Sequence, residues 1–335
     1  MTENRRVSAH ETTFNGEKAI CLQYGRYEAI ALPECGGNLI AFRDTEAGFH
    51  FLHEPAADEM DAFFAKPTSY GIPFLFPPNR YEDGKFPWNG KVYQFPINET
   101  ERNNHLHGFF HQIPWKVESF YSNSFESRLT MVQTVDPDHS AYTYFPHTFT
   151  IRLSYALSEN GLHQHVMVKN EGDEPMPCLL AFHTAINVPF AKDSSPEDYR
   201  LKVTIGNRWE MNERMLPTGR FQPLSEQEEQ MKNEGVYPFF AAMDNHYTAA
   251  PVNGSNRMEL TDLRLNVTLV YDAGTAYRNW MIWNNNATVG FFCPEPQINV
   301  VNAPNTKLSK EESGLISLQP GEIWEETSRL YWIQK

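Results

Sequence analysis

Cysteine is scarce in this sequence. Only four of the 335 residues are cysteines (Cys21, Cys35, Cys178 and Cys293), and they lie far apart with no C-x-x-C pair. A zinc knuckle or a thioredoxin-type motif therefore cannot be built from neighbouring cysteines. Each cysteine lies among apolar residues, which favours buried free thiols. A chain of this length buries enough apolar surface to fold without disulfide bonds.

Long apolar runs and excess positive charge are also missing. No stretch of 18 apolar residues occurs, and the N-terminal residues MTENRRVSAHETTF lack the apolar core of a signal peptide. The chain has 28 Lys and Arg against 42 Asp and Glu, a formal net charge of −14. That balance argues against nucleic acid and anionic membranes as partners. We therefore expect an acidic cytoplasmic protein in which the thiols stay reduced.

Alternation of apolar and polar residues dominates the chain and predicts β-strands. In residues 147–157 (HTFTIRLSYAL), every second side chain from Phe149 to Leu157 is apolar. Residues 159–172 alternate again after the hairpin signal Asn160-Gly161. Similar runs are YEAIALP (27–33), NLIAFRD (38–44), KVYQFPI (91–97), SRLTMVQTV (127–135), LRLNVTLVYD (263–272), TVGFFC (288–293) and two runs within 314–333.

Helical patterns are few. Residues 57–64 and 225–235 have suitable composition, and Ser225 with Glu228 has the form of a capping box. Strands do not alternate with long amphipathic helices, which argues against a parallel α/β sheet. We predict an all-β protein, a large antiparallel β-sandwich, with one domain over residues 1–335.

The first candidate site lies in residues 76–115. A stiff Pro77-Pro78 turn precedes Asn79-Arg80, and a hairpin is predicted around Asn89-Gly90. Planar hydrogen-bonding groups held beside a stiff turn suit the fixed hydroxyls of a sugar. The same dipeptide is also compatible with a solvated turn.

Two histidines follow in NNHLHGFF, residues 103–110. His105 and His107 are two residues apart, so on a strand they would point to the same side. A metal site needs a third and usually a fourth ligand, and no H-E-x-x-H motif occurs. His111, His183 and Glu295 are distant candidates for such ligands. Metal binding, acid/base catalysis and a structural role all stay open on the pattern alone.

Three further polar residues interrupt apolar segments. His183 breaks the run CLLAFHTAINVPF, which fits either a core histidine or a proton-transfer group. Glu295 lies between Pro294 and Pro296 after an apolar strand, where a charge carries a desolvation cost unless it has a partner or a function. Exposure at the strand tip is the alternative. Asp244 forms either an Asx turn or a contact to sugar hydroxyls.

These pieces together resemble the aldose 1-epimerase (galactose mutarotase-like) family. The resemblance covers about residues 20–333 and is carried by Asn79-Arg80, Gly84-Lys85-Phe86, Gly90 to Tyr93, and Asn104 to Gly108, in that order. Glu295-Pro296-Gln297 and NAPN (302–305) match the later E-P-Q and its asparagine-proline-rich turn.

The resemblance implies a β-supersandwich with a carbohydrate cleft and an enzyme that interconverts α and β anomers of an aldose. It implies that Glu295 is the general base, His183 the general acid and His107 a second active-site histidine. It places Asn79, Arg80, Asp244 and Gln297 on the substrate and calls for no metal or cofactor. A carboxylate with a pKa of about 4.3 and an imidazole near 6.5 can hold opposite protonation states near neutrality.

Some positions depart from the family pattern. The usual second glycine after Leu106-His107-Gly108 is Phe109, which we expect to reshape the substrate pocket. Asp244 is followed by Asn245 rather than by histidine, and His183 lies in F-H-T-A. The substrate is therefore not restricted to galactose or glucose.

Two alternatives share this fold. A sugar-phosphate 1-epimerase would need extra cations in the cleft, for which Arg26, Arg43, Arg80 and Arg278 are candidates. A non-catalytic carbohydrate-binding protein would use aromatic platforms such as Trp88, Trp280 and Trp283. A glycoside hydrolase is disfavoured, because it would normally need two facing carboxylates, whereas this set offers two histidines and one glutamate. We expect a small-molecule sugar as partner and a monomer or homodimer.

Overall fold

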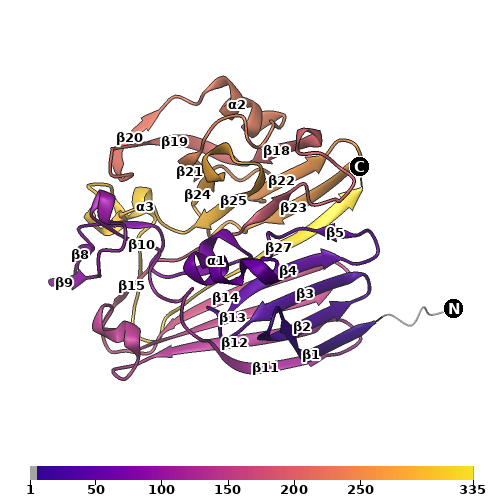
Figure 1. Cartoon of the computed structure of the whole chain (residues 1–335). Coiled ribbons are helices and arrows are strands. Elements are labelled where there is room, and N and C mark those ends of the chain that lie inside the picture. The colour runs from indigo at the N-terminus through magenta and orange to yellow at the C-terminus, as the bar shows by residue number, and fades with distance from the viewer. Residues whose placement is uncertain (1–5, 335) are drawn as a thin grey trace.

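An eight-stranded antiparallel sheet runs through the whole molecule (Figure 1). The computed structural model describes residues 6–334. In spatial order, the strands of this sheet are β11 (Lys116–Ser122), β12 (Ser127–Val135), β13 (Phe149–Ser158), β14 (Gly161–Asn170), β27 (Ile323–Gln334), β23 (Val267–Asp272), β22 (Arg257–Asp262) and β18 (Tyr199–Val203).

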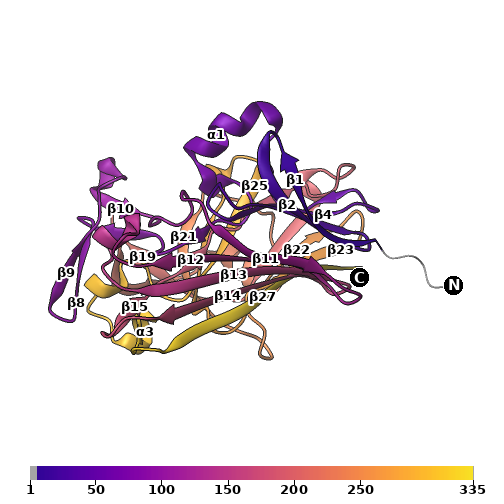
Figure 2. The same cartoon turned by 90° about the horizontal axis from the view of Figure 1, so that it is seen from below.

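A five-stranded N-terminal sheet covers one half of this large sheet. Its strands follow chain order: β1 (Val7–Phe14), β2 (Glu17–Tyr24), β3 (Tyr27–Leu32), β4 (Asn38–Asp44) and β5 (Phe49–His50). Strands β1 to β3 contact β11 to β13, and Figure 2 shows the two layers edge-on.

A third sheet lies beside the other half and carries Asp244, Glu295 and Gln297, and His183 directly follows one of its strands. Its spatial order is β20 (Pro217–Gln222), β19 (Ile205–Met211), β21 (Asp244–Ala249), β24 (Asn279–Trp283), β25 (Gly290–Gln297), β16 (Ala181–Phe182) and β6 (Phe74–Leu75), with β17 (Ile186–Val188) also paired to β25. Tyr271 of β23 and Trp280 of β24 join it to the large sheet, with ring centroids 6.2 Å apart.

Three two-stranded ribbons complete the sheet structure. They pair β7 (Arg80–Glu82) with β10 (Asn104–Leu106), β8 (Lys85–Trp88) with β9 (Lys91–Gln94), and β15 (Met176–Cys178) with β26 (Ile316–Leu318). The β8–β9 ribbon is the hairpin predicted around Asn89-Gly90.

The predicted alternation of side chains builds the core. Phe149, Ile151 and Leu153 of β13 are fully buried, and so are Val166 and Val168 of the neighbouring β14. One hydrophobic cluster contains residues of all three large sheets. Burial of this one face against the other two sheets explains why the sheets stack as a sandwich. The prediction of an antiparallel β-sandwich is confirmed.

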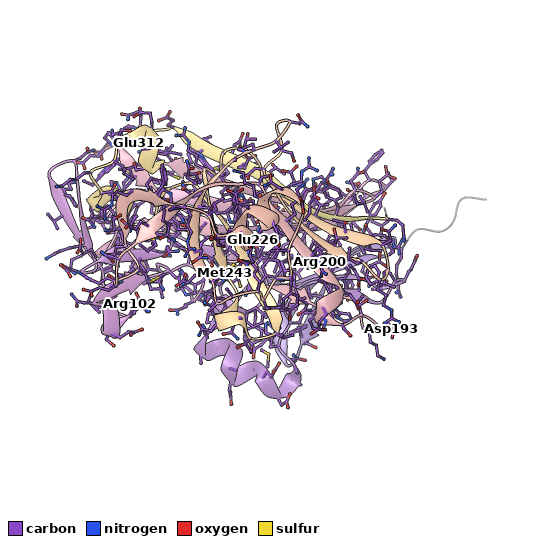
Figure 3. All side chains as sticks on the ribbon, turned by 90° about the horizontal axis from the view of Figure 1, so that it is seen from above. Arg102, Asp193, Arg200, Glu226, Met243 and Glu312 are labelled. Atoms are coloured by element: carbon purple, nitrogen blue, oxygen red, sulfur yellow. The ribbon has the colours of Figure 1, made fainter. Side chains whose placement is uncertain are left out.

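Helices are short and peripheral. α1 (Met60–Ala65) follows a 3-10 turn (Ala57–Glu59) and projects from the body in Figures 2 and 3. Met60 and Phe63 anchor it in a small apolar cluster. α2 (Glu226–Asn233) packs against β18, near the labelled Glu226 and Arg200 in Figure 3. α3 (Lys310–Ser313) is a single turn. No helix within residues 6–334 is both long and apolar enough to cross a bilayer.

The capping box predicted at the start of α2 is present. Ser225 accepts a hydrogen bond from the backbone N–H of Glu228, and the Glu228 carboxylate accepts one from the backbone N–H of Ser225. The helix predicted over 57–64 is divided differently, because its first turn is a 3-10 turn and the α-helix extends to Ala65.

Candidate active site

A cleft of about 410 Å³ gathers polar side chains from segments far apart in the chain, from Lys66 to Glu295. It opens beside α1 and the ends of β7, β10, β16 and β21. Six of the seven predicted site residues line it, namely Asn79, Arg80, His107, His183, Asp244 and Glu295.

Strand register brings Glu295 and His183 together. β16 and β25 are antiparallel with Ala181 opposite Gln297, so continuing the register by two residues places His183 opposite Glu295. His183 Nε2 lies 3.1 Å from Glu295 Oε1. Both residues are buried, with 5% and 1% of their surface exposed. The two groups proposed for proton transfer are thus in direct contact.

Burial shapes the protonation of this pair. It raises the pKa of the Glu295 carboxyl well above its usual range, and the nearby Asp244 adds to the rise while Arg80 opposes it. Burial also lowers the pKa of His183 to about 3, with a further contribution from the positive charge of Lys66. Burial thus disfavours the charged form of both groups, and a neutral carboxyl here can share its proton with the neutral imidazole.

His107 lies at the cleft just beyond the end of β10. Its ring meets that of His183 edge-to-face, with centroids 5.3 Å apart. Its Nδ1 is buried and has no hydrogen-bond partner among the described residues. Burial lowers the pKa of His107 well below its usual value, and the neighbouring His183 adds to this effect. His107 therefore presents a neutral imidazole to the cleft.

The two histidines of NNHLHGFF do not share a face, in contrast to the expectation for a strand. The strand ends at Leu106, and His107 adopts a left-handed backbone with φ of 69°. His105 is instead buried beside Phe95 and Phe109, and its Nδ1 lies 2.8 Å from the Pro96 carbonyl oxygen. Among residues 6–334, no three His, Cys, Asp or Glu side chains are grouped so that they could hold a metal ion. His105 does not line the cleft.

The turn that presents His107 depends on Gly108. Gly108 has φ of +66°, and a Cβ there would lie 2.2 Å from the Phe76 carbonyl oxygen. We expect Gly108→Ala to lower the free energy of unfolding by about 2 kcal/mol or more, because the left-handed backbone and the clash add together. Chemical denaturation would measure it. Gly90→Ala is the matched control, since Gly90 has φ of +76° but open space around it. Equal losses in both variants would contradict the role of the Phe76 contact.

Arg80 is held by two carboxylates. Its Nε donates to both oxygens of Glu99 at 3.0 Å, and its Nη2 donates to Asp244 Oδ2 at 3.1 Å. Glu99 is buried and also accepts hydrogen bonds from Arg102 and Asn104. The guanidinium is therefore fixed in orientation at the wall of the cleft.

Asn79 connects the arginine to the histidine. It has a left-handed backbone with φ of 57°, and its Oδ1 accepts a hydrogen bond from the Arg80 backbone N–H at 3.0 Å. Its carbonyl oxygen accepts one from the His107 N–H at 2.9 Å. The stiff turn predicted from Pro77-Pro78 thus positions both sides of the cleft.

Residues 18–331 match the protein family described as aldose 1-epimerase. The chain belongs to the aldose 1-epimerase family. A galactose mutarotase-like protein from Clostridium acetobutylicum has nearly the same structure, with a TM-score of 0.94 at 33% identity over 98% of this chain and 99% of that one. The predicted family resemblance is confirmed.

More distant relatives have lower sequence identity to this chain. Galactose 1-epimerase from Lactobacillus acidophilus NCFM has a TM-score of 0.73 at 13% identity over 98% of this chain and 99% of that one, which shows a common fold. A protein of Arthroderma benhamiae named probable aldose 1-epimerase is 26% identical over 161 residues, which are 44% of this chain. The match spans 35% of that protein's length.

Two predicted residues lie elsewhere in this aldose 1-epimerase fold. Gln297 is fully buried outside the cleft lining, and its Nε2 donates to Glu295 Oε2 at 3.4 Å. Phe109 does not line the cleft either. Its ring stacks on Tyr144, with centroids 5.2 Å apart, because the left-handed turn at His107 and Gly108 directs it away. Any effect of Phe109 on the shape of the pocket must therefore act through its neighbours His105 and Tyr144.

The three tryptophans considered as aromatic platforms differ in whether they reach the cleft. Trp283 lines the cleft, with its ring 5.9 Å from that of His183. Trp280 is fully buried and donates to Asn256, and Trp88 is buried with its Nε1 donating to the Pro175 carbonyl oxygen. Only Trp283 of these three is placed to touch a bound sugar.

The four arginines considered for a phosphate do not converge. Arg26 pairs with Asp44, Arg43 with Glu28 and Glu54, and Arg278 donates to the Glu311 carbonyl oxygen. Only Arg80 of the four lines the cleft, and its guanidinium is already bound by carboxylates.

Sequence patterns miss several members of the aldose 1-epimerase cleft. Glu99 orients Arg80 from 19 positions away but stands in the polar stretch INETERNN without any distinguishing spacing. Lys66 also lines the cleft, and so does His111, which the sequence raised only as a distant candidate for a metal ligand. No sequence pattern marks Lys66, because its place at the cleft depends on how α1 docks on the body.

Proposed function

We propose that this protein is an aldose 1-epimerase that interconverts the α and β anomers of a sugar by opening its ring. The observation that supports it best is the buried contact between Glu295 Oε1 and His183 Nε2, 3.1 Å apart in a cleft with room for a small molecule. Mutarotation needs one proton removed and one supplied, and this pair holds one proton and one vacant site.

The proposed reaction starts with the sugar between the two groups. The C1 hydroxyl donates a hydrogen bond to Glu295, which favours the carboxylate and leaves the shared proton on His183. Glu295 takes the C1 hydroxyl proton while His183 protonates the ring oxygen, and the bond between C1 and the ring oxygen breaks. The C1 oxygen becomes the aldehyde oxygen. Rotation about the C1–C2 bond and reversal of both proton transfers close the ring on the other face.

The neighbouring side chains assist this step by position and charge. His107, next to His183, can donate a hydrogen bond to a sugar oxygen, and Arg80 with Asp244 can hold sugar hydroxyls. The steps transfer protons only, so the proposal needs no metal or cofactor. Activity is expected to survive dialysis against EDTA.

The direct test is anomer exchange. Purified protein is expected to speed the equilibration of freshly dissolved aldoses, followed by polarimetry or by NMR exchange between the two C1 protons. The panel should contain neutral hexoses, pentoses, hexose 6-phosphates and hexuronates. No acceleration with any of them would overturn the proposed function and favour a binding protein.

We also propose that the chain folds as one domain. The cleft takes residues from Lys66 to Glu295, and a single hydrophobic cluster extends from Ile20 to Leu330. Neither could form from one half of the chain.

A further inference from the structure

Lys66 stands at the rim of the cleft on a fixed segment. It follows α1 directly, and its backbone N–H donates to the Ala62 carbonyl oxygen at 2.9 Å. The next three residues, 67–69, are buried. Its ammonium lies over the indole of Trp283, 4.5 Å from the ring centroid. The side chain is exposed. Lys66 itself and the Trp283 indole under its ammonium both line the cleft.

The charge of Lys66 is not balanced. The cleft lining contains one other cation, Arg80, which is matched by Glu99 and Asp244. No carboxylate within residues 6–334 forms an ion pair with Lys66. The acidic residues of the α1 segment, Asp58, Glu59 and Asp61, lie outside the cleft lining.

This unbalanced cation works against the proposed catalytic acid. Lys66 and His183 contact the same indole, with the two rings 5.9 Å apart. The ammonium therefore helps to lower the pKa of His183, which must carry a proton when the sugar ring opens. A bound anion beside Lys66 would cancel its positive field and make the imidazolium easier to form. A neutral sugar would leave the penalty in place.

We propose that the aldose accepted by this cleft carries an anionic group, a phosphate or a carboxylate, and that Lys66 binds that group. The inference rests on the proposed function and names its substrate class. In this arrangement C1 lies near His183, and the anionic group lies near the Trp283 indole that Lys66 covers. The sugar face lies against the indole, and the ammonium moves from the indole to the anion.

The experiment compares neutral and anionic sugars in the same assay. Anomer exchange is measured with glucose, glucose 6-phosphate and glucuronate for the wild type and Lys66→Met. Methionine keeps the apolar stem over the indole and removes the charge. The wild type is expected to favour one of the anionic sugars over glucose by about tenfold to a hundredfold in kcat/KM, as for one charge-assisted hydrogen bond. The choice between glucose 6-phosphate and glucuronate identifies the anion.

Lys66→Met is expected to remove that preference, mainly by raising KM for the anionic sugar. Its kcat/KM for glucose should rise, because the cation that opposes protonation of His183 is gone. Lys116→Met is the matched control, since Lys116 is an exposed lysine on β11 outside the cleft. It should keep the preference. Added salt should weaken the preference in the wild type only, because Lys66 is exposed.

The outcomes separate the two proposals. A wild type that exchanges glucose as well as both anionic sugars overturns the role of Lys66 and leaves the epimerase intact. A preference that survives in Lys66→Met also overturns it. If no sugar is exchanged, the epimerase proposal fails, and calorimetric binding of the same sugars decides the role of Lys66. Tighter wild-type binding of an anionic sugar, lost in Lys66→Met, then supports it, and equal binding overturns it.

Discussion

Replacing Glu295 by glutamine is expected to lower anomer exchange by at least about a hundredfold, the usual minimum for loss of a proton-transfer group. The amide has nearly the same shape but cannot accept the C1 hydroxyl proton. It also leaves His183 without the carboxylate at 3.1 Å with which it shares a proton. Polarimetry with the best sugar of the panel measures the change.

The stability of this variant separates a catalytic from a structural role. Burial of the Glu295 carboxyl is unfavourable for its charged form, so removing the charge should not weaken the fold. We expect a Tm within about 3 °C of the wild type, a shift of about 1 kcal/mol in a chain of this size. Glu118→Gln, at an exposed carboxylate on β11, should keep full activity. Near-normal activity of Glu295→Gln would refute the assignment of the base.

Acidification from pH 6.5 to about 4 is expected to unfold the protein. Four histidines with at most 5% exposure have lowered pKa values: about 4 for His105 and His111, and about 3 for His183 and His246. Burial is the first cause in each. The unfolded chain binds protons on these groups below pH 6.5, while the folded chain does not. Stability is therefore complete above pH 6.5 and falls as the pH drops toward the folded values.

The size of this effect follows from the number of groups. Each histidine contributes about 1.4 kcal/mol per pH unit within its window, so the four together approach the whole stability of an ordinary protein within two or three pH units. Glu295 acts in the opposite direction, because its raised pKa makes the folded state bind a proton earlier as the pH falls. One such group offsets only part of the loss.

Urea unfolding at a series of pH values tests this dependence. His105→Phe fits the aromatic surroundings of Phe95 and Phe109 and removes one titrating group, so its stability should fall less steeply with pH. His10→Gln, at an exposed position, should leave the slope unchanged. A stability that stays constant between pH 7 and pH 5 would contradict the prediction.

Local patterns in the sequence predict most of the strand framework. The hairpin of β13 and β14 follows from Asn160-Gly161 and from alternation on both sides, because burial of one face requires every second residue to be apolar. The same rule fails at His107. Alternation holds only while the backbone is extended, and the left-handed turn after Leu106 sends His107 into the cleft while His105 stays in the core.

Contacts between residues far apart in the chain cannot be predicted from local patterns. Glu99 is an unremarkable acid in the sequence, yet it fixes Arg80 from a different turn. The family resemblance placed Gln297 on the substrate, but in the structure it is buried outside the cleft lining, beside the glutamate. Whether a polar side chain faces the cleft or the core depends on which strand covers it.

By itself, the sequence determined the fold class, the family, and which polar residues interrupt apolar strands, because each of these depends on neighbouring residues or on an ordered motif. Only the tertiary structure decided that His183 and Glu295 meet, since their contact follows from the pairing of β16 with β25. It also decided that Lys66 stands over Trp283 without a carboxylate partner among the described residues. Long-range contacts of this kind arise from strand register and docking, and no local spacing encodes them.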